Sequence, residues 1–105
     1  MPKGEREWEQ RGVEAEQVDE VSEPPMYRVL LHNDDFTTME FVIFILENLF
    51  GHPSERAFEI MMHVHQRGVG VAGVFPFEVA EAKAKSATEL ARANEYPLLL
   101  TVEEA

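Results

Sequence analysis

Asn33, Asp34 and Asp35 place several oxygen acceptors within one short polar stretch of this 105-residue chain. A run of β-forming residues precedes them, and an apolar segment whose first large side chain is Met39 follows. These groups exceed what one helix cap requires, which suggests a cation held beside an apolar hollow. On these residues alone, a simple strand-to-helix connection is an equal alternative.

A histidine in a later segment could add another acceptor. His65 shares one side of a predicted helix with Met61 and Val64, because residues three and four apart are neighbours on a helix surface. A lone histidine at the edge of an apolar surface usually belongs to the fold. The helix by itself therefore does not assign His65 a role.

These residue types give little support to an enzymatic function. Nucleophilic catalysis needs a Ser, Thr or Cys beside an oriented base, and no such signature is present. Oxygen ligands with an imidazole suit several divalent ions, so a metal-assisted hydrolase built on Asn33, Asp34, Asp35 and His65 is kept as an alternative. A structural interaction module without a peptide pocket is the third hypothesis.

The net charge and composition of the chain limit the classes of molecule that it is expected to bind. Twenty acidic and nine basic residues give a net charge of −11, which argues against nucleic acid and anionic membranes and favours a cationic partner. The chain has no cysteine, which excludes disulfides and cysteine-ligated zinc, and no cofactor is implied. The longest uninterrupted aliphatic and aromatic run covers residues 41–46, too short to span a membrane, so we expect a soluble cytoplasmic protein.

The chain divides at a pair of prolines. Residues 1–25 hold eight acidic and three basic residues, show no apolar periodicity and end at Pro24-Pro25, so they are predicted to form a disordered acidic arm. Residues 26–105 are predicted to form one domain. Its elements follow the order β-α-α-β-α-β and cover, in sequence, residues 26–32, 38–50, 54–67, 69–75, 77–93 and 97–102. This order predicts an α+β fold with a small three-stranded antiparallel sheet covered on one side by three helices.

Local signals set the expected helix ends. Thr37 and Glu40 match a capping box, Ser54 is the predicted N-cap of the second helix, and Gly51 and Gly68 are expected to end the first two helices. Residues 68–73 spell G-x-G-x-x-G, but a helix precedes them and their alternation is typical of a strand. Dinucleotide binding is therefore rejected.

Residues 24–43 resemble the opening of the ClpS adaptor family, with the sequence Pro-Pro-Met-Tyr-Arg-Val-Leu-Leu-His-Asn-Asp-Asp-Phe-Thr-Thr-Met-Glu-Phe-Val-Ile. The likeness spans residues 24 to about 102 and continues through Met61-Met62-x-Val64-His65 with Gly68, Gly73-Val74-Phe75-x-x-Glu78-Val79-Ala80-Glu81-x-Lys83, and Pro97-Leu98. Several positions depart from the usual pattern, namely His32, Phe36, Thr38 and Phe44. These departures leave the expected pocket intact.

The resemblance implies a non-enzymatic adaptor that delivers proteins with bulky hydrophobic N-terminal residues to an AAA+ unfoldase of a Clp protease. It implies that the substrate's α-amino group is bound by Asn33, Asp34 or Asp35, Thr37 and His65. It implies a pocket for the first side chain formed by Met39, Val42, Met61, Val64 and Leu98. The N-terminal domain of a ClpA- or ClpC-type unfoldase would contact Glu78 and Lys83, and the acidic arm would reach towards its pore.

The chemistry of the residues agrees with this resemblance. An α-ammonium group needs several acceptors, which an Asn, an ionised Asp and a neutral His supply, whereas an acetylated or internal residue lacks the charge and the donors. Burying a Leu or Phe side chain contributes about 1.5–3 kcal/mol. The terminus and its side chain would therefore be recognised together.

Overall fold

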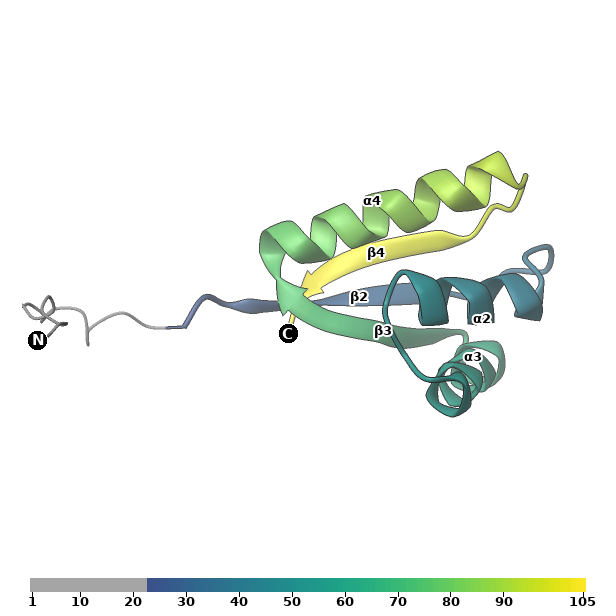
Figure 1. Ribbon diagram of the computed structural model, residues 1–105, viewed down its shortest axis with the longest axis horizontal. Coiled ribbons are helices and arrows are strands. Elements are labelled where there is room, and N and C mark those ends of the chain that lie inside the picture. The colour runs from purple at the N-terminus through teal and green to yellow at the C-terminus, as the bar shows by residue number, and fades with distance from the viewer. Residues whose placement is uncertain (1–22) are drawn as a thin grey trace, which may run out of the picture.

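The computed structural model describes residues 23–105. Its elements are β2 (Met26–His32), α2 (Met39–Asn48), α3 (Ser54–Arg67), β3 (Val69–Pro76), α4 (Phe77–Ala93) and β4 (Leu99–Glu104) (Figure 1). The predicted β-α-α-β-α-β order is therefore confirmed. Most of the predicted acidic arm lies outside the described residues. In the described range, no helix is long and apolar enough to cross a bilayer.

The sheet is antiparallel and has the strand order β3-β2-β4, so β2 lies in its middle. Alternate residues of a strand point to opposite faces, and Val29 and Leu31 of β2 are completely buried on one face. Ala72 and Leu100 of the flanking strands are buried as well. One face of the sheet is therefore covered, as predicted.

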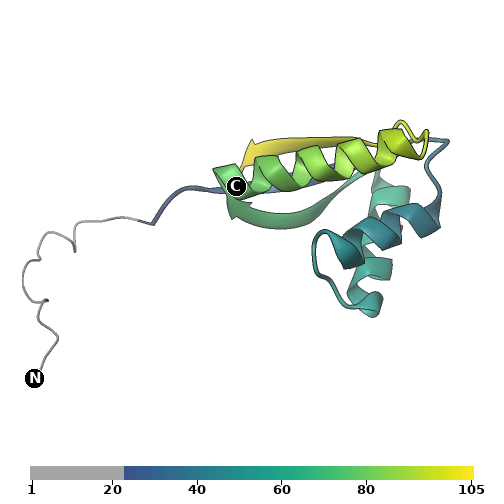
Figure 2. The ribbon, with the colours of Figure 1, turned by 45° about the horizontal axis from the view of Figure 1, so that its top comes forward.

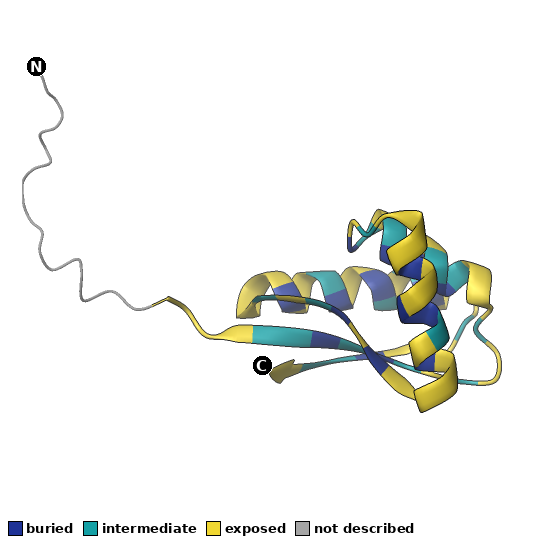
Figure 3. Cartoon of the chain, turned by 90° about the horizontal axis from the view of Figure 1, so that it is seen from below, coloured by how far each residue is buried: buried dark blue, intermediate teal, exposed yellow. Residues whose placement is uncertain are grey.

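Three helices cover that face in two groups. Helix α4 runs along the sheet and packs through a row of small buried residues, Ala80, Ala84, Ala87 and Ala91 (Figures 1 and 2). Helices α2 and α3 pack together at one end of the sheet (Figure 2). Figure 3 shows that buried residues recur along one side of these helices while the other side is exposed. The helical periodicity therefore directs one stripe of each helix inward.

Helix α3 approaches β3 closely at Gly70. A Cβ atom at this position would lie 2.7 Å from Cγ2 of Val64, which is closer than packed carbon atoms normally come. The lack of a side chain at Gly70 thus allows the second half of α3 to pack closely on β3. This close packing positions Val64 and the neighbouring His65.

Two predicted N-caps are wrong. Thr38, not Thr37, caps α2, because the Thr38 hydroxyl accepts a hydrogen bond of 3.2 Å from the Phe41 N–H. The Thr37 hydroxyl instead donates to Asp34. Helix α3 begins at Ser54 itself, after Pro53, and has no side-chain cap.

The helix and strand ends also differ in part from the expectation. Helix α2 ends at Asn48, two residues earlier than predicted, although Gly51 has the positive φ of 73° that suits a turn after a helix. Gly68 ends α3 as predicted, with φ of 91°. Strand β4 begins at Leu99 rather than Pro97, since proline has no N–H to donate to a sheet.

Candidate functional site

The turn after β2 is built around the carboxylate of Asp34. Its Oδ1 accepts hydrogen bonds from the N–H groups of Phe36 (2.8 Å) and Thr37 (2.7 Å), and its Oδ2 accepts one from the Thr37 hydroxyl (2.8 Å). An Asp side chain that bonds the following backbone favours such a turn. Asp34 is therefore engaged in holding the turn together.

These bonds also set the protonation of Asp34. Partial burial raises the pKa of the carboxyl group, but the hydrogen bonds from Thr37 and Phe36, helped by the positive charge of Arg92, outweigh it. The pKa of Asp34 consequently lies below its ordinary value. Asp34 is ionised at neutral pH and keeps the turn in one geometry.

A single backbone bond joins this turn to the end of α3. The Asn33 N–H donates to the carbonyl oxygen of Gly68 at 2.9 Å. His65 lies in the last turn of α3, so the bond brings the first polar stretch beside the histidine. The side chains of Asn33, Asp35 and His65 are all exposed.

A cavity of about 220 Å³ lies between this turn and the two helices. It is bordered by Asn33, Asp34, Asp35, Thr37, Met39, Val42, Met61, Val64 and His65. The predicted set of amine-binding residues and four of the five predicted pocket residues thus surround one space. The fifth, Leu98, is 1% exposed and does not border the cavity.

The cavity has an apolar wall and a polar rim. Val42, Met61 and Val64 are buried, whereas Met39 is 43% exposed. Pockets for drug-sized ligands measure about 300–1,000 Å³, so this smaller space suits one side chain rather than a whole cofactor. The arrangement can take an apolar side chain and a cation attached next to it.

The acidic and imidazole groups of this site do not form a metal centre. Within residues 23–105, no three His, Cys, Asp or Glu side chains are placed to hold one ion together. Asp34 is also engaged with the turn through both of its oxygens. The geometry therefore does not support the metal-assisted alternative.

The two residues expected to face an unfoldase lie on α4. Glu78 is exposed in the first turn of the helix. Lys83 is half-buried, and its Nζ donates to the carbonyl oxygen of Leu49 at 2.8 Å. The same Nζ lies 5.9 Å from the ring centroid of Phe50. Lys83 thus also joins α4 to the end of α2, which the sequence did not indicate.

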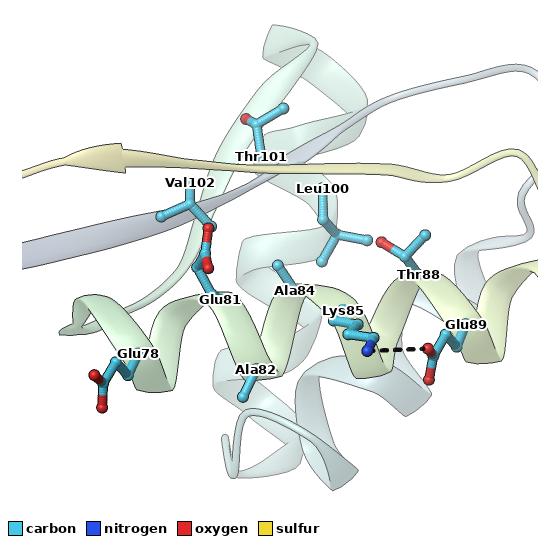
Figure 4. A pocket seen from close by; sticks show the side chains of 10 residues that line it. All are labelled: Glu78, Glu81, Ala82, Ala84, Lys85, Thr88, Glu89, Leu100, Thr101 and Val102. Carbon is cyan, nitrogen blue, oxygen red and sulfur yellow. Dashed lines mark ion pairs between the residues drawn. The ribbon is translucent and has the colours of Figure 1, made fainter.

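A broader depression of about 810 Å³ lies between α4 and β4 (Figure 4). Figure 4 shows Leu100 and Val102 pointing from the strand towards the helix, while Lys85 and Glu89 lie 4.0 Å apart along the helix. Of the predicted site residues it contains only Glu78. It does not combine amine acceptors with an apolar hollow.

Two residues near the turn were missed by the sequence reasoning. They are Tyr96, whose hydroxyl lies 3.4 Å from the Thr38 hydroxyl, and Arg92, whose positive charge lowers the pKa of Asp34. Both come from the end of α4 and the loop after it. No local pattern signals contacts between segments this far apart in the chain.

Comparison with known proteins identifies a family for this chain. Residues 22–101 match the family model described as ATP-dependent Clp protease adaptor protein ClpS. An adaptor of this name from Methylococcus capsulatus is 54% identical over 85 residues, covering 81% of this chain and 80% of that protein. The adaptor from Hyphomonas neptunium is 54% identical over 81 residues, covering 77% and 69% respectively.

A solved structure shares the fold. Agrobacterium tumefaciens ClpS2 bound to L-phenylalaninamide is 37% identical, superposes with a TM-score of 0.76, and is matched over 79% of this chain and 100% of that one. The family model covers most of this chain, and the related proteins are named adaptors rather than enzymes. The chain therefore belongs to the ClpS family of ATP-dependent Clp protease adaptors.

Proposed function

We propose that this adaptor binds proteins with a free N-terminal Leu, Phe, Tyr or Trp and delivers them to the N-terminal domain of a ClpA- or ClpC-type AAA+ unfoldase. One observation carries the proposal: the acceptors of Asn33, Asp35 and His65 border the same small cavity as the apolar groups of Met39 and Met61. L-Phenylalaninamide, bound by the Agrobacterium relative, combines a free amine with an aromatic side chain.

In this proposal the two adjacent carboxylates have different tasks. Asp34 maintains the turn, because both of its oxygens already accept hydrogen bonds from it. Asp35 is exposed at the cavity and provides the negative charge for the α-ammonium group. Asn33 and the imidazole nitrogen of His65 provide further acceptors, so that the three N–H bonds of the ammonium are satisfied.

The apolar wall selects the first side chain. Leu and aromatic side chains enter between Met39, Met61 and Val64, and flexible methionines adapt to rings of different size. Branching at Cβ widens a side chain next to its backbone, where the half-exposed Met39 stands. Val and Ile are therefore rejected at the mouth of the pocket.

The surface for the unfoldase lies on α4, away from the cavity. Glu78 and Lys83 both border a shallow depression that also includes Leu49 and Val79. Glu78 is exposed and can form a charged contact, whereas the ammonium group of Lys83 also donates a hydrogen bond to Leu49. A substrate and the unfoldase can then be held together by the adaptor in the cytoplasm.

Titration with peptides that differ only at the first residue tests the proposal. A Phe-initiated peptide is expected to bind tightly, whereas acetyl-Phe and Val-initiated peptides are expected not to bind, because the first lacks the charge and the second does not fit. Calorimetry on the full chain measures these affinities. Equal affinity for the free and acetylated peptides would rule out recognition of the amine.

A further inference from the structure

Phe36 is an exposed aromatic residue that is held in place. It is 75% exposed, more than any other large apolar side chain in residues 23–105. Its N–H nevertheless donates to Oδ1 of Asp34 at 2.8 Å, within the turn that this carboxylate organises. The ring is therefore presented to solvent from a fixed backbone.

A groove of about 460 Å³ adjoins this ring. It is bordered by Phe36, Arg92, Glu95, Tyr96 and Pro97. Its far wall is well supported, because the Arg92 guanidinium donates to the carbonyl oxygens of Tyr96 (2.8 Å) and Leu98 (2.9 Å). The ring of Tyr96 also packs on Phe41, with 4.7 Å between the ring centroids.

The groove and the amine site share one wall. Asp35 and Thr37 border the cavity, while Phe36, between them in the sequence, borders the groove. The Thr38 hydroxyl lies 3.4 Å from the Tyr96 hydroxyl across the same region. Figures 1 and 2 show the turn before α2 next to the C-terminal end of α4 in both views. A peptide leaving the cavity has this groove within reach.

We propose that the groove binds the second side chain of the substrate and favours an aromatic one there. This subsite rests on the proposed function. In an extended peptide, successive side chains point to opposite sides and residues advance by about 3.3–3.6 Å. With the first side chain in the cavity, the second points across the turn towards Phe36. Aromatic rings attract each other in offset or edge-to-face geometry, which Phe36 and Tyr96 both offer.

A thermodynamic cycle tests the subsite. Two peptides begin with Leu-Phe and Leu-Ala and are otherwise identical, and a third carries Phe at the fifth position instead. The wild-type adaptor is expected to bind the Leu-Phe peptide about 3- to 10-fold more tightly than the other two, which is the size of one aromatic contact. Phe36→Ala should reduce this ratio to about one while leaving the affinity for Leu-Ala unchanged.

Phe58→Ala is the matched control. Phe58 lies on α3, is 53% exposed and borders neither the cavity nor the groove, so its removal should leave the ratio intact. Thermal unfolding checks that both variants stay folded. Equal and tight binding of all three peptides, or a ratio that survives in Phe36→Ala, overturns the subsite alone. Failure of every Leu-initiated peptide to bind overturns the subsite together with the proposed function.

Discussion

Asp34 and Asp35 are adjacent in sequence but differ in environment. Asp34 is half-buried and accepts three hydrogen bonds from its own turn, whereas Asp35 is exposed at the rim of the cavity. An ionised carboxylate that is already satisfied stabilises the fold, and one that remains accessible can accept a ligand. Asp34 thus stabilises the turn, whereas the neighbouring Asp35 remains accessible for the binding role proposed above.

Protonation of Asp34 should lower the stability of the folded adaptor at acidic pH. Its pKa is lowered in the folded state, so its contribution to stability is present above the unfolded-state value near 3.8 and is lost as the pH falls through the folded-state value. Urea unfolding between pH 7 and pH 3 should show that wild-type loses more stability than Asp34→Asn. Parallel curves would mean that this carboxylate is equally free in both states.

Replacing His65 should weaken peptide binding but change the stability of the fold only slightly. Its side chain is exposed, so His65→Ala is expected to change the free energy of unfolding by less than about 0.5 kcal/mol. Loss of one amine acceptor should weaken binding of a Phe-initiated peptide by about 1–3 kcal/mol. Calorimetry and thermal unfolding on the same samples separate the two effects. If the variant does not fold, the histidine is a core residue and the assigned site is wrong.

Among the elements, α2 depends on a charge supplied from outside itself. It has no basic residue in its last turn, and Lys83 of α4 donates to Leu49 at its C-terminal end. A positive group at a helix C-terminus satisfies a free carbonyl and interacts well with the helix dipole. Lys83 therefore connects the surface proposed for the unfoldase with α2, which forms one wall of the cavity.

Removing this contact should destabilise the domain. Lys83→Met keeps the aliphatic chain but loses the hydrogen bond, so the free energy of unfolding is expected to fall by about 1–2 kcal/mol. Lys85→Met is the control, because Lys85 is exposed and its ion pair with Glu89, the one it forms within residues 23–105, is 4.0 Å long. Chemical unfolding measures both. Equal stability of the two variants would show that the bond to Leu49 contributes nothing.

The sequence predicted the elements well because their signals are local. The β-forming residues at 26–32 and the helical spacing of Met61, Val64 and His65 are visible in a few neighbouring positions. The N-cap was wrongly predicted at Thr37 for a specific reason, since two threonines are adjacent in the sequence. The hydroxyl of Thr37 donates a hydrogen bond to the carboxylate of Asp34, and the hydroxyl of Thr38 caps the helix instead. Sequence spacing does not reveal that competition.

Most of the residues that border the cavity were among the predicted site residues, but they were identified through resemblance rather than geometry. Acceptor chemistry at residues 33–35 suggested a cation, and the family pattern added the distant His65 and Met61. The hydrogen bond from Asn33 to Gly68 brings the polar turn and the end of α3 together. Because it joins two backbone groups, the amino-acid types at these positions do not reveal it. The contact of Lys83 with Leu49 spans 34 residues and was missed for the same reason.

At the scale of the whole molecule, the net charge of −11 should steer cationic peptide ends to the pocket. The association rate of a Phe-initiated peptide should therefore decrease as sodium chloride is raised, because salt screens exposed charges beyond about 8–10 Å. Dissociation should change less, since it depends on close contacts in the cavity. Stopped-flow fluorescence measures both rates, and a salt-independent association rate would contradict steering.

The central place of β2 has a consequence for local unfolding. Its amide and carbonyl groups are paired with strands on both sides, so they are released last when the edges of the sheet open, and their hydrogen exchange should be the slowest in the domain. The polar turn that holds the acceptors emerges directly from this protected strand. The turn that carries the proposed amine acceptors should therefore keep its position until the sheet itself unfolds.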